Sequence, residues 1–267
     1  MIMRQILKCF PGGKHKVLTM SYDDGRSSDR RLVEIFNKNG IKGTFHLNSG
    51  LLGKGDRIPQ DEVKELYEGH EVAAHTVTHP TIARCPKEQI VREILENRKN
   101  LESIVGYTVR GFSYPNGSVS NEVKAILPHL GIEYARTVVS TKSFSIPDNF
   151  YLWDATCHHN HGLMELAESF VSLNKKQYLY MMYVWGHSYE FDDDDNWDLI
   201  EKFCEYIGRR DDIWYATNIE IVDYFKVLDN LKFSVAGDFV YNPSASSAWL
   251  SVDGEIVEVK GGEQINL

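Results

Sequence analysis

Between about residue 16 and residue 228, short apolar runs alternate with longer segments whose apolar residues recur at helical spacing. The run at 16–21 (KVLTMS) predicts a buried strand, and the segment at 29–38 predicts an amphipathic helix. Strands that alternate with helices predict a parallel sheet with helical crossovers. About seven such units suit a (β/α) barrel better than a short open sheet. An open doubly wound sheet is the alternative.

The same pattern predicts further strands at 43–47, 71–74, 109–114, 133–138, 178–185 and 213–217, and helices at 60–68, from 86 onward, and at 121–130, 163–173, 197–208 and 219–227. Beyond residue 229 the apolar residues alternate in the manner of strands, and Val252-Asp253-Gly254-Glu255 contains a hairpin turn signal. We therefore divide the chain into a barrel at 1–228 and a small C-terminal β appendage at 229–267.

Composition disfavours several classes of function. The formal net charge of −9 argues against a nucleic-acid or anionic-membrane partner, because both need a concentrated basic surface. No apolar run reaches the roughly 18 residues that a membrane span needs. The four cysteines are widely spaced and form no C-x-x-C pair, so neither a disulfide framework nor a cysteine-based zinc site is predicted. The N-terminal segment lacks the apolar core of a signal peptide, and we expect a cytoplasmic protein.

Two adjacent carboxylates, Asp23 and Asp24, follow the first predicted strand and precede Gly25. Active sites of βα barrels lie at the carboxyl ends of the strands, which is where these side chains should lie. One carboxylate could bind a metal while the other takes a proton from a water molecule on that metal. Taken alone, a D-D-G sequence is more often a solvated turn.

Two histidines four residues apart, His75 and His79, follow the predicted strand at 71–74. On a helical turn or a tight loop, imidazoles at this spacing can bind one cation. One carboxylate with two imidazoles leaves open positions for water and substrate, as a catalytic metal site requires.

A later predicted strand, at 178–185, is followed by His187. A histidine at this position is a candidate general acid for a leaving amine, and Trp185 could shield it from solvent. Trp185 and Tyr114, two aromatic residues near strand ends, are also expected to contact the substrate.

In this order, these segments resemble the polysaccharide deacetylases, which carry the chitooligosaccharide deacetylase homology domain of carbohydrate esterase family 4. The resemblance rests on Tyr22-Asp23-Asp24-Gly25, His75-Thr76-Val77-Thr78-His79 and His187, and covers roughly residues 16 to 225. It implies a distorted (β/α) barrel of about seven parallel strands. It also implies a divalent metal ion, usually zinc, with cobalt, nickel or manganese as substitutes.

The resemblance implies a role for each of these residues. Asp23 would be the general base, Asp24, His75 and His79 the metal ligands, and His187 the general acid. The reaction would be removal of an acetyl group from an N-acetylated, or O-acetylated, sugar or polysaccharide.

The third motif departs from the family pattern. Where the family usually has Arg-Pro-Pro-Tyr-Gly, this chain has Ser113-Tyr114-Pro115-Asn116-Gly117, preceded by Phe112. Ser113 thus replaces the arginine that orients the base. Asn116 replaces a tyrosine whose backbone N–H binds the oxyanion, a role that Asn116 could keep. Arg110 is a candidate for the function of the lost arginine.

The fourth motif is indistinct, and Asp154 is the candidate for the carboxylate that tunes His187. The histidines of the segment 157–161 could form a second metal site, but solvated histidines or histidines that contact substrate are the preferred interpretation. The acidic run at 192–195 is interpreted as a solvated turn before a helix, where negative side chains are favourable.

Two rival functions stay open. A barrel of this kind could instead hydrolyse a small non-sugar amide or cyclic imide, which the altered third motif and the expected cytoplasmic location both permit. The chain could also be a non-catalytic carbohydrate-binding homologue, although a pure binder has little need for a base beside a metal. For the main interpretation, the expected partner is a carbohydrate or a small acetylated substrate.

Overall fold

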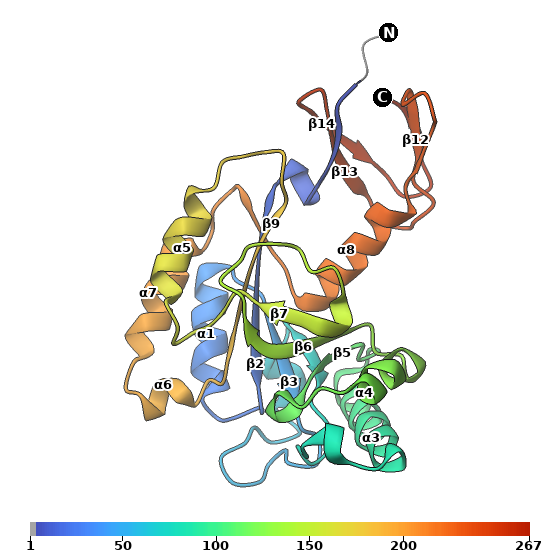
Figure 1. Ribbon diagram of the computed structural model, residues 1–267. Coiled ribbons are helices and arrows are strands. Elements are labelled where there is room, and N and C mark those ends of the chain that lie inside the picture. The colour runs from blue at the N-terminus through green and yellow to red at the C-terminus, as the bar shows by residue number, and fades with distance from the viewer. Residues whose placement is uncertain (1–3) are drawn as a thin grey trace.

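The computed structural model describes residues 4–267, and its centre is a parallel sheet (Figure 1). The strands of this sheet are β2 (Lys16–Asp23), β3 (Gly43–Leu47), β4 (Glu71–Ala74), β5 (Gly111–Ser113), β6 (Tyr134–Ser140), β7 (Trp153–Ala155), β8 (Cys157–His158), β9 (Tyr180–Gly186) and β10 (Ile213–Tyr215). They lie in the order β7-β6-β5-β4-β3-β2-β9-β8, and β10 pairs with β2. Strand β2 is buried along its whole length, as expected for a central strand covered on both faces.

The sheet closes on itself because its two edge strands are consecutive in the chain. Only Thr156 separates the edge strand β7 from the edge strand β8. The Thr156 backbone N–H donates to the Tyr183 carbonyl (2.8 Å), and the His158 N–H donates to Ser140 Oγ at the end of β6 (3.1 Å). The result is the distorted (β/α) barrel that the sequence predicts.

Helices cover the outside of the barrel (Figure 1). They are α1 (Asp29–Asn39), α2 (Val63–Leu66), α3 (Lys87–Val105), α4 (Asn121–Ile126), α5 (Leu163–Ser172), α6 (Glu190–Asp193), α7 (Trp197–Ile207) and α8 (Asn218–Asn230). Helix α7 packs against α1 and α5, and α3 packs against β4. Among the described residues, none of these helices is long and apolar enough to cross a membrane.

Most predicted elements are present, with small differences at their ends. The two short strands β7 and β8 were not predicted, because two or three residues are too few to show a periodicity. The helix predicted at 60–68 is shorter, since only Val63–Leu66 is helical.

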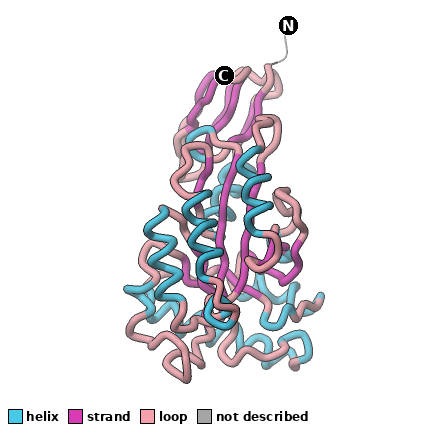
Figure 2. Tube along the Cα trace, turned by 90° about the vertical axis from the view of Figure 1, so that its left-hand side faces the viewer, coloured by secondary structure: helices cyan, strands magenta, loops and turns pink. Residues whose placement is uncertain are grey.

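A β-rich appendage lies at the end of the barrel where the strands begin (Figures 1 and 2). Its strands are β1 (Ile6–Cys9), β11 (Lys232–Phe233), β12 (Phe239–Tyr241), β13 (Ala248–Val252), β14 (Glu255–Val259) and β15 (Gln264–Asn266). They form two small antiparallel sheets, β1-β13-β14 and β11-β12-β15. Strand β1 comes from the N-terminal part of the chain, which the predicted division at residue 228 did not anticipate.

Candidate metal centre and catalytic site

The polar side chains singled out in the sequence meet at the carboxyl ends of neighbouring parallel strands. Asp23 is the last residue of β2, and Ser113 is the last residue of β5. His75 directly follows β4, and His187 directly follows β9. Parallel register places the ends of these strands at one edge of the sheet, which is why residues distant in sequence become neighbours.

Asp24, His75 and His79 form a cluster in which one ligand atom from each lies within 4.8 Å of the others. Asp24 Oδ1 is 3.9 Å from His75 Nε2 and 3.7 Å from His79 Nε2. Asp24 Oδ1 is buried and has no hydrogen-bond partner. A buried carboxylate oxygen without a partner is costly unless a cation completes its surroundings, so this set fits a divalent metal ion.

Ser113 orients His75 toward that cluster. The Ser113 carbonyl and hydroxyl oxygens lie 2.9 and 2.6 Å from His75 Nδ1, which leaves Nε2 directed at Asp24. Holding one ring nitrogen in this way is the usual means of fixing a metal-binding histidine. Burial is the main cause that lowers the pKa of His75 to about 3, which favours the neutral, ligating form.

The backbone at the cluster is unusual. Asp24, Thr76 and His79 have φ angles of 81°, 67° and 59°, a left-handed region that residues other than glycine rarely adopt. Such conformations persist when the surrounding structure imposes them, and they concentrate at functional sites. Here the His79 backbone N–H donates to Thr76 Oγ1 (3.0 Å), which holds the turn between the two histidines.

Asp23 lies beside the cluster but is bound by other groups. Its Oδ2 accepts a hydrogen bond from the Arg136 guanidinium, and its Oδ1 lies 3.2 Å from both His46 Nδ1 and Ser113 Oγ. Burial alone would raise the pKa of Asp23, but Arg136, His75 and His46 together hold it well below the usual range. Asp23 is therefore an ionised carboxylate 3.8 Å from His75 Nε2.

Arg136 supplies the cation that the altered third motif lacks. It lies in β6, is fully buried, and also packs 4.4 Å from the Trp185 ring. Sequence analysis did not identify it. The feature that could have identified Arg136 is its charge inside the predicted strand at 133–138, because a charged side chain in a buried strand needs a partner.

His187 is held by Glu190, three residues later. Its Nδ1 lies 3.2 Å from Glu190 Oε1, and its backbone N–H donates to Glu190 Oε2 (3.0 Å). Burial alone would lower the pKa of His187, but the Glu190 carboxylate and the charges of Asp23 and Asp24 raise it above its ordinary value. The imidazole is thus favoured in the protonated state that a general acid needs.

Of the predicted site residues, Arg110 and Asp154 lie elsewhere. Arg110 does not reach Asp23, because its guanidinium pairs with Asp223 and Glu133 at 2.7 and 2.8 Å. Asp154 was predicted to lie beside His187, but its carboxylate accepts a hydrogen bond from Thr137. The carboxylate beside His187 is that of Glu190.

Tyr114 is likewise turned away from the site. Its side chain is buried, and its hydroxyl donates to the Tyr151 carbonyl (2.8 Å), so the prediction that it contacts substrate is wrong. Asn116 follows in an exposed turn with a φ of 56°. Trp185 is buried between Arg136 and His187, with its ring centre 5.9 Å from that of His187.

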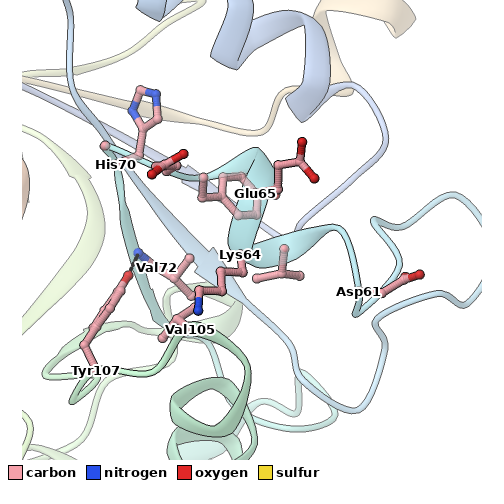
Figure 3. A pocket seen from close by; sticks show the side chains of 11 residues that line it. Asp61, Lys64, Glu65, His70, Val72, Val105 and Tyr107 are labelled. Atoms are coloured by element: carbon pink, nitrogen blue, oxygen red, sulfur yellow. Dashed lines mark hydrogen bonds between the residues drawn. The ribbon is translucent and has the colours of Figure 1, made fainter.

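A separate hollow of about 500 Å³ lies at the other end of β4 (Figure 3). Lys64, His70 and Tyr107 line it, and the Val72 backbone N–H donates to the Tyr107 hydroxyl (2.9 Å). Val72 lies in the first half of β4, whereas His75 follows its last residue. The length of the strand therefore separates this hollow from the metal cluster.

Comparison with known proteins points to the family that the sequence motifs resemble. The model of the polysaccharide deacetylase family matches residues 11–135. Chitin deacetylase 1 of Cryptococcus neoformans is 30% identical over 115 residues, which are 42% of this chain and 24% of that protein. The chitooligosaccharide deacetylase of Sinorhizobium fredii is 28% identical over 131 residues, 48% of this chain and 60% of that protein. The chain thus spans about a quarter of the fungal relative.

The fold is also found among solved structures. A candidate polysaccharide deacetylase from Mycobacterium smegmatis superposes with a TM-score of 0.63 at 15% identity, covering 85% of this chain and 95% of that one. With the barrel, the ligand cluster and the family match together, the chain is similar to the polysaccharide deacetylases over residues 11–135, just under half of its length.

Proposed function

We propose that this chain is a metal-dependent hydrolase that removes the acetyl group from an N-acetylated or O-acetylated sugar or polysaccharide. The observation that carries the proposal is a base beside a ligand cluster: Asp23 Oδ2 lies 3.8 Å from His75 Nε2 while Arg136 binds the same carboxylate. An ionised carboxylate next to an open metal site is what general-base activation of water requires.

The proposed ion is zinc, because one carboxylate and two imidazoles match an open catalytic zinc site. The same ligands would accept cobalt, nickel or manganese. A divalent ion held by Asp24, His75 and His79 would polarise the acetyl carbonyl and lower the pKa of a water molecule at the site.

The residues of the chain divide the proton transfers between them. Asp23 takes a proton from the attacking water as the new C–O bond forms at the acetyl carbon. The Asn116 backbone N–H donates a hydrogen bond to the oxyanion that develops. His187 then gives a proton to the departing amine or alcohol as the C–N or C–O bond breaks, and acetate is the second product.

The first test combines metal analysis with acetate release from a panel of acetylated oligosaccharides. We expect Asp23→Asn to keep its metal and lose roughly 10²–10⁴-fold in turnover, and His79→Ala to lose metal affinity. Metal without acetate release would shift the assignment to a small amide substrate or a non-catalytic homologue. Wild-type turnover in Asp23→Asn would show that Asp23 is not the base.

A further inference from the structure

Beside the proposed catalytic site lies a second cluster of metal-binding groups, made of His158, His159 and Glu190. One ligand atom from each of these residues lies within 4.8 Å of the others. Glu190 Oε2 is 3.0 Å from His158 Nε2 and 3.3 Å from His159 Nε2. We propose that these three side chains bind a second divalent transition-metal ion, of the zinc or cobalt type.

His159 is the observation that points to a ligand. Its side chain is fully buried, and neither ring nitrogen has a hydrogen-bond partner. The ring is stacked between Phe191 (4.1 Å between ring centres) and Tyr22 (5.7 Å), which prevents it from turning to find one. A buried imidazole without hydrogen bonds is costly, and a metal ion on Nε2 would remove that cost.

His158 has the orientation that a ligand at this position needs. Its Nδ1 accepts a hydrogen bond from the Asn160 backbone N–H (3.3 Å), so Nε2 faces Glu190 and carries the proton when no metal is bound. Metal binding would displace that proton, as is usual for histidine ligands. Two imidazoles and one carboxylate are the ligand set of open zinc sites.

The carboxylate can serve both neighbours at once. Its Oε1 lies 3.2 Å from His187 Nδ1, whereas Oε2 accepts a hydrogen bond from the His187 backbone N–H (3.0 Å) and also faces His158 and His159. A carboxylate oxygen has two lone pairs, so the second metal would use the remaining one on Oε2 and leave both contacts with His187 in place.

An open cavity gives an ion access to this cluster. It has a volume of about 600 Å³ and is lined by His158, Glu190, His161 and Trp185, among others. Entry through this cavity does not pass the Asp24, His75 and His79 cluster, whose residues do not line it. The two sites should accordingly fill independently.

The test is metal stoichiometry. The full chain, stripped with a chelator and equilibrated with Zn²⁺, should hold two ions per chain after free metal is removed. His159→Phe keeps the ring stack and removes both nitrogens, so it should hold one ion, and so should His158→Phe. His161→Phe is the matched control and should still hold two, because His161 is outside the ligand group.

The variant His75→Ala/His79→Ala separates this proposal from the proposed function. It should retain one ion at the second cluster, and Co²⁺ bound there should give visible absorption bands. Adding His159→Phe to the double alanine variant should abolish these bands. The second site is absent if both His158→Phe and His159→Phe still hold two ions. It is also absent if the wild-type protein binds only one ion and the double alanine variant loses that ion. If instead the double alanine variant still holds two ions, the proposed catalytic metal site fails while the second site stands. Circular dichroism confirms that each variant is folded. If either phenylalanine variant is unfolded, the number of metal ions per chain is measured again in His158→Asn.

Discussion

The Asp23 carboxylate illustrates how single residues determine this site. It is buried in contact with Arg136, His46 and Ser113, and each contact stabilises its charged form. A buried charge that loses its partner is strongly destabilising, because the remaining charge has neither water nor a counter-ion. The same contacts aim the carboxylate at the position beside His75 where a reacting water would lie.

We expect Arg136→Met to lower the free energy of unfolding by about 3–5 kcal/mol, the usual cost of breaking a buried ion pair. Arg136→Lys should lose less, since it keeps the charge but not the planar guanidinium. Urea unfolding measures both. Arg110→Met is the control: its pairs with Asp223 and Glu133 are partly exposed, and we expect a loss of about 1 kcal/mol or less. Equal losses at the two arginines would contradict the role assigned to Arg136.

Glu190 raises the pKa of His187, so its charge should control the alkaline limb of the pH–rate profile. A general acid works while protonated, that is, below its pKa. In the His159→Phe background, which lacks the proposed second ion, Glu190→Gln removes a negative charge, lowers the pKa of His187 and should move the alkaline limb of kcat to lower pH. Asp154→Asn, which alters a carboxylate bonded to Thr137, should leave the limb unchanged. An unmoved limb in Glu190→Gln would exclude Glu190 as the partner of His187.

The strands explain which parts of the site could be predicted. Residues directly after a predicted strand, such as Asp24, His75 and His187, are recognisable because parallel strands end at a common edge. Arg136 and Glu190 were missed for different reasons. Arg136 reaches Asp23 across 113 positions of sequence, through a strand order that periodicity does not reveal. Glu190 lies in a one-turn helix too short to show a pattern, although it is three residues from its partner.

The end of β9 also depends on the absence of a side chain. A Cβ atom at Gly186 would clash with His159 Nδ1, and the His159 ring is fixed by its stacking on Phe191 and Tyr22. Gly186→Ala should therefore cost about 1–3 kcal/mol in the free energy of unfolding, as overpacking does. The double variant Gly186→Ala/His159→Ala should lose less than the sum of the two single variants. Additive losses would mean that the two residues do not interact.

At the scale of the whole molecule, the appendage is packed onto the barrel by both ends of the chain. Strand β1 pairs with β13, and the Tyr224 hydroxyl of α8 donates to the Cys9 carbonyl (2.6 Å) while accepting from the Trp249 N–H (3.1 Å). A shared apolar cluster joins these parts. The alternation of apolar and polar residues predicts a boundary at residue 228. It does not reveal that the early strand β1 pairs with the late strand β13.

Removing residues 231–267 should therefore destabilise the barrel rather than release an independent unit. The deletion takes away the partner of β1 and buried apolar members of the shared cluster: Leu231, Val240, Ala248, Leu250, Val252 and Val259. A fully buried Val or Leu contributes roughly 1.5–3 kcal/mol, and 1 kcal/mol corresponds to about 2–4 °C in a domain of this size. We expect the Tm to fall by more than about 10 °C in calorimetry.

A shorter deletion of residues 263–267 is the matched control for that measurement. It removes β15 and the residue after it, and the deleted residues that pack against the cluster, Ile265 and Leu267, are only partly buried, so the Tm should fall much less. Metal binding at Asp24, His75 and His79 should survive in the folded fraction of both truncated chains, because those residues lie at the opposite ends of the strands from the appendage (Figure 1). If the longer deletion melted within a few degrees of the full chain, the appendage would be an independent unit, and the packing around Tyr224 would contribute little to the stability of the barrel.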